Sequence, residues 1–308
     1  MFNKSIVLPA FFPESMEDAK HFLNAIKTLK DYDIYSVEFY YKGNDKKAIR
    51  EYLVNYNINS FYLGAMATKQ RNLNLSSLNK ELREKSIQEM KKCIEDAYFY
   101  GSTAILVNSG RRTDNEEDEI AYEYFKKSLE ELLEYIDGKA KDYKLYLTLE
   151  PGDTGVDSFS LVGNTDLAIK LVQEIREKYR NFGLTMDTSH LRQLDENPLD
   201  SIKKAFPYCN HIHLANCIIK DKTSNLYGDK HPEFGIEGGE ISIEEFGNIL
   251  DNIKEIYEVS NLWVGLEIIC RKIDHKEKIE YFKNTMKNLK WIQKIKIKKE
   301  KNRNGQKK

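Results

Sequence analysis

The sequence predicts an α/β fold, a closed parallel (β/α)8 barrel of the TIM type with its active site at the C-terminal mouth of the strands. Short apolar segments alternate with longer segments of helical periodicity along the 308 residues. This alternation requires crossover connections and therefore a parallel sheet. Eight strand–helix units suit a closed barrel, and the polar residues at the ends of the late strands suit a functional mouth.

The expected strands are short runs rich in Val, Ile, Leu, Tyr and Phe. Their apolar residues are continuous, which is typical of parallel strands buried on both faces. An open doubly wound sheet is the rival arrangement, but no GxGxxG motif follows the first strand, which weakens a dinucleotide-binding interpretation. The expected strands are residues 6–12, 34–40, 59–66, 103–108, 145–150, 182–187, 211–214 and 263–269.

The expected helices lie between these strands and carry apolar residues at every third or fourth position, the pattern of a helix with one buried face. Ser15 with Asp18, and Ser242 with Glu245, have the spacing of a capping box and predict helix starts. The clearest apolar stripes cover residues 19–29, 78–97, 124–136, 246–256 and 279–292.

The domain organisation is predicted to be one catalytic barrel, residues 1–293, and a disordered basic tail, residues 294–308. The formal net charge is -1, but the tail holds seven Lys and one Arg against one Glu, so it carries +7 and the barrel -8. A body this acidic excludes a strongly basic nucleic-acid-binding domain, because phosphate binding needs a positive face.

A cytoplasmic protein without a membrane partner is expected. No apolar run approaches the roughly 20 residues that span a bilayer, and the N-terminal segment lacks the features of a secretory signal. The four cysteines have no CxxC spacing and are interpreted as reduced thiols. They are Cys93, Cys209, Cys217 and Cys270.

Potential metal ligands lie at the ends of four successive strands: Glu150, Asp187, His213 and Glu267. A carboxylate at the end of a buried strand is costly unless it is paired or coordinated. Strand ends of a closed barrel meet at one mouth, so these groups are expected to converge there. Two Glu, one Asp and one His suit Mn2+, Zn2+, Co2+ or Mg2+.

Each of these residues also has an ordinary structural interpretation. Glu150 alone would be an ion-pair or capping residue, and Glu267 alone could pair with Arg271. Strand alternation makes His211 and His213 point the same way, and a single histidine there would usually be a hydrogen-bonded structural residue. The ordered occurrence on four strands favours the metal site.

The late strands carry Glu150, Asp187-x-x-His190, His211-x-His213 and Glu267 in this order. The ordered set resembles the xylose isomerase-like TIM barrels, a superfamily that includes sugar and sugar phosphate isomerases and epimerases and the metal-dependent family 2 AP endonucleases. The resemblance implies that the four strand-end groups hold one divalent metal and that the two glutamates move protons. It also implies that His190 contacts the substrate or a second metal.

The loop after the seventh expected strand adds the sequence Gly228-Asp229-Lys230-His231. In some members of the superfamily such an element builds a second metal site, here from His190, Asp229 and His231. The alternative is that Asp229 is a turn residue and His231 an exposed loop histidine, and both interpretations stay open.

Two departures from the superfamily narrow its implications. The AP endonucleases have further histidines after the third and fourth strands, where this chain has residues 64–67 and 108–110 without one. Nucleic acid is therefore not an expected partner. The keto-sugar epimerases have a Glu and an Arg near the positions held here by Val156 and Ile219.

The sequence thus predicts a divalent-metal-dependent isomerase or epimerase of a sugar or sugar phosphate, acting by proton transfer through a metal-stabilised enediolate. Arg111 and Arg192 closely follow strands and are candidate substrate-binding residues, although a solvated or ion-paired Arg is the commoner role. The alternatives are a metal-dependent phosphoester hydrolase related to the AP endonucleases and a non-catalytic metal-binding barrel. The oligomeric state stays open, a homo-oligomer included.

Overall fold

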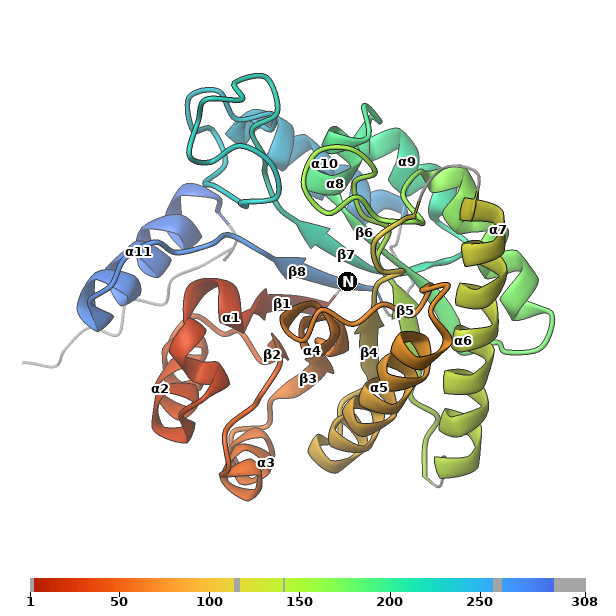
Figure 1. Cartoon of the computed structure of the whole chain (residues 1–308). Helices are drawn as coiled ribbons and strands as arrows, with labels where there is room; N and C mark the ends of the chain where they lie inside the picture. The colour runs from red at the N-terminus through yellow and green to blue at the C-terminus, as the bar shows by residue number, and fades with distance from the viewer. Residues whose placement is uncertain (1–2, 114–116, 141, 257–261, 291–308) are drawn as a thin grey trace, which may run out of the picture.

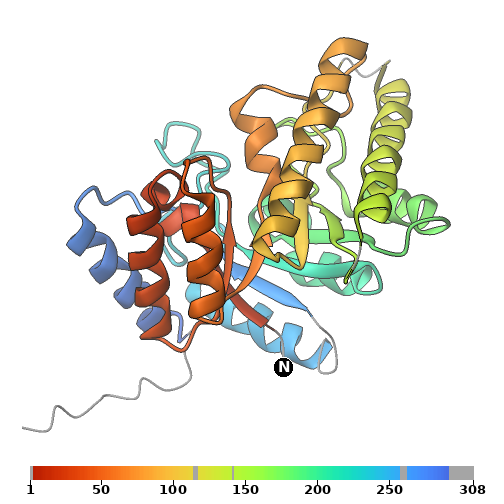
Figure 2. The ribbon, with the colours of Figure 1, turned by 90° about the horizontal axis from the view of Figure 1, so that it is seen from below.

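The computed structural model describes residues 3–113, 117–140, 142–256 and 262–290. Eight parallel strands form one closed barrel in the order β1 to β8, which confirms the predicted (β/α)8 fold. Figure 1 shows the strands in the middle with the helices around them, and Figure 2 shows the same arrangement from below. The strands are β1 (Asn3–Val7), β2 (Ser36–Phe39), β3 (Asn59–Tyr62), β4 (Ala104–Val107), β5 (Tyr146–Leu149), β6 (Phe182–Asp187), β7 (Cys209–Leu214) and β8 (Trp263–Leu266).

The helices follow the strands in the expected alternation, with extra short helices near the mouth. Their apolar faces pack on the outside of the barrel and form one continuous core with the strands. They are α1 (Leu8–Phe11), the 3-10 helix η1 (Pro13–Met16), α2 (Ala19–Lys30), α3 (Lys46–Asn55), α4 (Gly64–Gln70), α5 (Lys80–Tyr100), α6 (Asp118–Lys139), α7 (Thr165–Arg176), α8 (Thr188–Gln193), α9 (Pro198–Ala205), α10 (Ile243–Ile256) and α11 (His275–Asn288).

The first and third strands are shorter than the apolar runs predicted. The backbone leaves the sheet after Val7 and after Tyr62 and enters the short buried helices α1 and α4. An apolar run alone does not distinguish a buried strand from a buried helical turn. Both helices lie after strand ends and so contribute to the mouth.

One of the two predicted helix starts is misplaced. Ser15 lies inside η1, and Asp18 caps α2 by accepting from the backbone N–H of Lys20 at 2.7 Å. Ser242 does accept from the N–H of Glu245 at 3.0 Å, directly before α10.

Polar side chains occupy the inside of the barrel below the mouth. Ser5, Glu38, Thr148, Thr185 and His211 have no exposed surface. Buried polar groups of this kind must satisfy one another, and these do so through hydrogen bonds across the barrel. A hydrogen-bonded network of buried polar side chains thus lies beneath the mouth.

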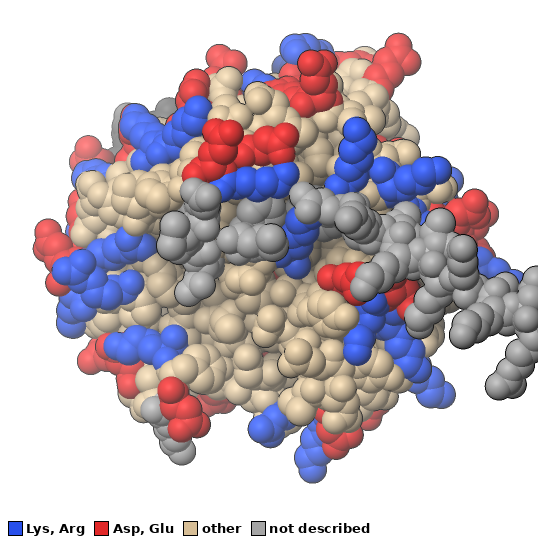
Figure 3. All heavy atoms as spheres, turned by 180° about the vertical axis from the view of Figure 1, so that it is seen from behind, with Lys and Arg blue, Asp and Glu red and all other residues tan. Residues whose placement is uncertain are grey.

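Three further features of the described residues concern the helices, the cysteines and the surface charge. No described helix is long and apolar enough to cross a membrane, and the four cysteines are free and buried. On the face drawn in Figure 3, Lys and Arg are interspersed with Asp and Glu. The predicted basic tail, residues 294–308, lies outside the described residues.

Candidate metal centre at the barrel mouth

Four side chains from the late strands meet at the C-terminal mouth: Glu150 directly after β5, Asp187 at the end of β6, His213 in β7 and Glu267 directly after β8. One donor atom from each lies within 4.8 Å of the others. The backbone N–H groups of Glu150 and Glu267 still donate to the preceding strand, at 2.9 and 3.0 Å. The sheet therefore fixes the backbone of both glutamates.

His213 is the centre of this group. Its Nδ1 atom lies 2.6 Å from Glu150 Oε1, 3.2 Å from Glu267 Oε2 and 3.9 Å from Asp187 Oδ2. His213 and Asp187 are buried, whereas the side chains of Glu150 and Glu267 are 15% and 21% exposed. The two glutamates therefore border the opening and are accessible to a molecule in the mouth.

The two carboxylate oxygens of Asp187 have different surroundings. Its Oδ1 atom caps α8 by accepting from the N–H groups of Ser189 and His190, at 2.6 and 3.2 Å. Its Oδ2 atom is buried and has no hydrogen-bond partner among the described residues. A buried carboxylate oxygen without a donor is costly, and this one faces the same space as His213 Nδ1.

A second group adjoins the first and shares Asp187 with it. Donor atoms of Asp187, His190 and His231 lie within 4.8 Å of one another. Asp229 Oδ1 lies 3.3 Å from His190 Nε2 and 2.6 Å from His231 Nε2. His231 Nδ1 lies 3.4 Å from Glu267 Oε1 and links the two groups. Asp229 and His231 therefore lie at the mouth and are largely buried, so His231 is not an exposed loop histidine.

The carboxylates of both groups concentrate negative charge around the histidines. Burial opposes the charged form of His190, but Asp187 and Asp229 outweigh it and raise the pKa of His190 to about 10. Burial likewise opposes a charged His213, yet Glu38, Glu150 and Glu267 raise its pKa well above the ordinary range. Carboxylates that attract protons so strongly will also attract a metal cation.

The residues present fit a divalent ion. Three carboxylates and one imidazole provide a mixed oxygen and nitrogen donor set: imidazole suits Zn2+, and carboxylates suit Mg2+ and Mn2+. The unpartnered Asp187 Oδ2 supports this fit, because an ion between it and His213 Nδ1 would satisfy both.

Comparison with known proteins identifies the family. The family model of the xylose isomerase-like TIM barrel matches residues 24–295. The chain belongs to this family. A curated relative, the uncharacterized protein MJ1311 of Methanocaldococcus jannaschii, is 29% identical over 231 residues, which cover 68% of this chain and 71% of the relative.

Solved structures share the fold of this xylose isomerase-like barrel. The IolI protein with a bound zinc atom superposes with a TM-score of 0.68 at 15% identity, covering 94% of this chain and 99% of the other. A D-tagatose 3-epimerase-like protein gives 0.67 at 17% identity, covering 94% and 98%. The 3-keto-D-glucoside 4-epimerase YcjR of E. coli gives 0.67 at 12% identity, covering 95% and 99%. At these identities the similarity establishes the shared fold.

The two candidate substrate-binding arginines of this xylose isomerase-like barrel have partners of their own. Arg192 extends from α8 to α10 and forms an ion pair with Glu245. The Arg111 guanidinium lies over the ring of Phe159, with 4.7 Å between its central carbon and the ring centroid. Among the hydrogen bonds and ion pairs of the described residues, neither arginine is joined to the two donor groups. Their role in substrate binding stays a prediction.

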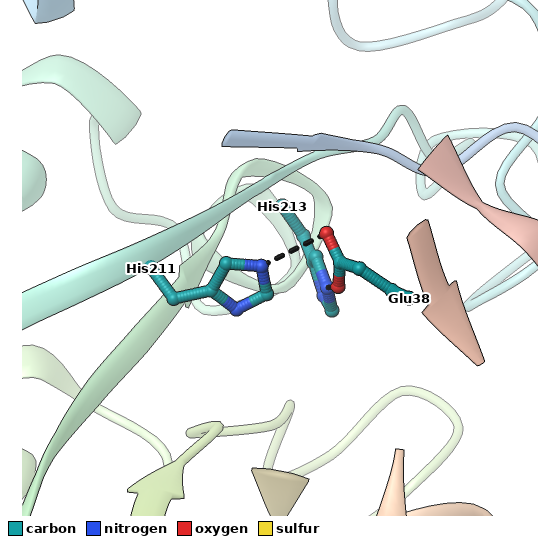
Figure 4. Close-up of side chains that lie close together, drawn as sticks. All are labelled: Glu38, His211 and His213. Atoms are coloured by element: carbon teal, nitrogen blue, oxygen red, sulfur yellow. Dashed lines mark hydrogen bonds and ion pairs between the residues drawn. The ribbon is translucent and has the colours of Figure 1, made fainter. Parts of the chain in front are cut away.

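Sequence reasoning missed two charged residues of the site. Glu38, in the middle of β2, contacts both His211 and His213 (Figure 4). Lys69, on α4, has its ammonium 3.7 Å from Asp229 Oδ2, and its side chain is 72% exposed. A single carboxylate inside an apolar strand could have drawn attention to Glu38. Nothing in the sequence around Lys69, seven residues after the end of β3, indicates a functional residue.

Proposed function

We propose that this xylose isomerase-like barrel is a divalent-metal-dependent isomerase or epimerase of a sugar or sugar phosphate. The observation that carries the proposal is the pair of partly exposed glutamates, Glu150 and Glu267, on either side of the buried donors His213 and Asp187. The epimerases among the structural neighbours support a small-molecule sugar as substrate.

The chemistry needs a base, an acid and a means of stabilising negative charge. Glu150, Asp187, His213 and Glu267 would hold the ion, which when bound polarises the substrate carbonyl and offsets enediolate charge. One glutamate takes the proton from the carbon beside the carbonyl, and the C–H electron pair becomes the C=C bond of the enediolate. The other glutamate, as its acid, returns a proton.

The face and the carbon at which the proton returns decide the product. Return to the opposite face of the same carbon is epimerisation, and return to the neighbouring carbon is aldose–ketose isomerisation. Glu150 and Glu267 approach His213 Nδ1 from different strands, β5 and β8, and this placement favours two bases acting on opposite faces. A panel of ketoses, aldoses and their phosphates, assayed with the Mn2+-loaded protein, tests the proposal; no conversion of any of them would count against it.

Phosphoester hydrolysis is the second candidate function. The observation that favours it is the adjoining group of Asp187, His190 and His231, because two ions sharing a carboxylate form a clamp for a phosphate ester. Release of inorganic phosphate from the sugar phosphates of the panel, without an isomeric product, would favour hydrolysis over proton transfer.

Metal binding is expected to release a proton and to strengthen as the pH rises. The pKa of His213 in the metal-free protein lies well above 6.5, so at neutral pH its Nδ1 carries a proton that the ion must displace. The apparent affinity should rise up to about tenfold per pH unit below that pKa and level off above it. Zn2+ titrations at several pH values measure this, and an affinity independent of pH would contradict ligation by His213.

Replacing Lys69 by Met is expected to raise KM about tenfold and to leave kcat and metal affinity within about twofold. The ammonium stands beside Asp229 at the mouth, and a charge-assisted hydrogen bond to a substrate oxygen has about the energy of this loss. Steady-state kinetics measure it, with Lys80→Met, on the exposed surface of α5, as the control. A KM equal to that of the control variant would remove Lys69 from the substrate site.

A further inference from the structure

A fully buried carboxylate lies directly beneath the proposed metal site. Glu38 in β2 faces β7 across the barrel interior and lies between two imidazoles (Figure 4). Its Oε2 atom is 2.7 Å from His213 Nε2, and its Oε1 atom is 3.0 Å from His211 Nε2. Glu38 and His211 have no exposed surface and His213 almost none, so bulk solvent does not reach these contacts.

The barrel makes room for this carboxylate. Gly265 in β8 lies beside His213 in the register of the sheet. A Cβ atom at position 265 would overlap Glu38 Oε1 and would lie 3.1 Å from His213 Cδ2. A glycine is thus needed where the Glu38 carboxylate approaches the β8 backbone.

The hydrogen bonds around Glu38 allow an arrangement in which every donor points toward the carboxylate. The Ser5 hydroxyl donates to Glu38 Oε1. The Thr185 hydroxyl lies 3.0 Å from His211 Nδ1 and 2.9 Å from the Thr148 hydroxyl. If Thr148 donates to Thr185 and Thr185 donates to Nδ1, His211 carries its proton on Nε2 and gives it to Glu38. Each hydrogen-bond donor among Ser5, Thr148, Thr185 and His211 then has an acceptor.

We propose that Glu38 is a positioning residue that accepts the Nε2–H of His213, so that Nδ1, once an ion has displaced its proton, presents its lone pair on the side of Glu150, Asp187 and Glu267. The proposal rests on the metal site of the proposed function. A carboxylate behind a ligating histidine fixes its tautomer and ring orientation and raises its basicity. His211, Thr185 and Ser5 hold Glu38 in place.

The same atoms allow a different arrangement that the experiment must distinguish. Donor atoms of Glu38, His211 and His213 also lie within 4.8 Å of one another, so an ion bound between them would use His213 Nε2. The short contacts of 2.7 and 3.0 Å have the length of hydrogen bonds between these groups. The two arrangements therefore differ in which nitrogen of His213 meets the metal.

Nuclear magnetic resonance of the intact protein tests the proposal without a substitution. The protein is loaded with cadmium-113 and its histidines are labelled with nitrogen-15. We expect the His213 Nδ1 signal to be coupled to cadmium and the Nε2 signal to carry a proton. Coupling at Nε2, or a proton on Nδ1, would overturn the role of Glu38. Absence of any cadmium binding would overturn the proposed function as well.

Zn2+ affinity of Glu38→Gln gives the second measurement. The carboxamide has no negative charge and accepts from only one of the two imidazoles. We therefore expect the Zn2+ affinity to fall about 10- to 100-fold. Glu89→Gln is the control, because it removes another buried carboxylate, one that is paired with Arg71. Its Zn2+ affinity should fall less than about twofold. If Glu38→Gln does not fold, Thr185→Val takes its place. It removes the hydroxyl that hydrogen-bonds to His211 Nδ1, and the Zn2+ affinity should fall about threefold to tenfold. Unchanged affinity, in Glu38→Gln or in Thr185→Val used in its place, would leave the metal site standing and refute the role of Glu38.

Discussion

Replacing Glu267 by Gln is expected to lower the rate of the proposed epimerisation by about 10²- to 10⁴-fold at saturating metal, the usual contribution of a positioned acid or base. Gln has the same shape and still offers an oxygen to the ion, but it does not accept a proton from carbon. Glu244→Gln, on the exposed first turn of α10, is the control and should keep the full rate.

The comparison with Glu150→Gln makes this prediction sharper. If the two glutamates act on opposite faces, each variant loses epimerisation but retains one base. Glu267→Gln should still exchange the C–H of one epimer with solvent, and Glu150→Gln that of the other. Equal loss of exchange with both epimers in both variants would contradict two opposed bases and would favour a single base.

Replacing Asp187 by Asn is expected to abolish the metal-induced rise in melting temperature and to weaken Zn2+ binding by at least about 100-fold. This loss exceeds that expected for a residue that only hydrogen-bonds to a ligand. The Asn oxygen can still accept from the N–H groups of Ser189 and His190, so α8 keeps its cap. The amide NH2 replaces Oδ2, the oxygen without a partner, and places a donor where the ion would bind.

Asp18→Asn is the matched control for this variant. Asp18 caps α2 with the same geometry, accepting from the N–H groups of Lys20 and His21 at 2.7 and 3.0 Å, and belongs to neither donor group. Differential scanning calorimetry with and without Zn2+ measures both. A saturating ion at 100 times its Kd stabilises by about 2.7 kcal/mol, which Asp18→Asn should retain. A full metal response in Asp187→Asn would remove Asp187 from the ligand set.

The fold and the four donors were predictable because both follow from strand order. Residues that end successive parallel strands of a closed barrel must meet, so Glu150, Asp187, His213 and Glu267 needed no knowledge of distances. The position of Asp229 and His231 relative to the mouth depends on the path of a long loop. Only the coordinates distinguish a second donor group from a turn residue and an exposed loop histidine.

Glu38 and Arg192 have long-range partners that the sequence does not reveal. Glu38 does not end its strand, and its partners are 173 and 175 residues away, so only the inward direction of β2 brings them together. Arg192 lies close to Asp187 in the chain, but a charged partner on α10, Glu245, holds it instead. Long-range pairing of this kind leaves no local signal in a single sequence.

Proton exchange in heavy water tests the central claim most directly. The Mn2+-loaded protein is incubated in heavy water with the sugar that the panel identifies, and the product is analysed by mass spectrometry and nuclear magnetic resonance. Proton transfer by Glu150 and Glu267 predicts one deuterium on the carbon that received the proton, and no turnover after the metal is removed with a chelator. A product formed without deuterium, or at the same rate in the metal-free protein, would contradict the proposed mechanism.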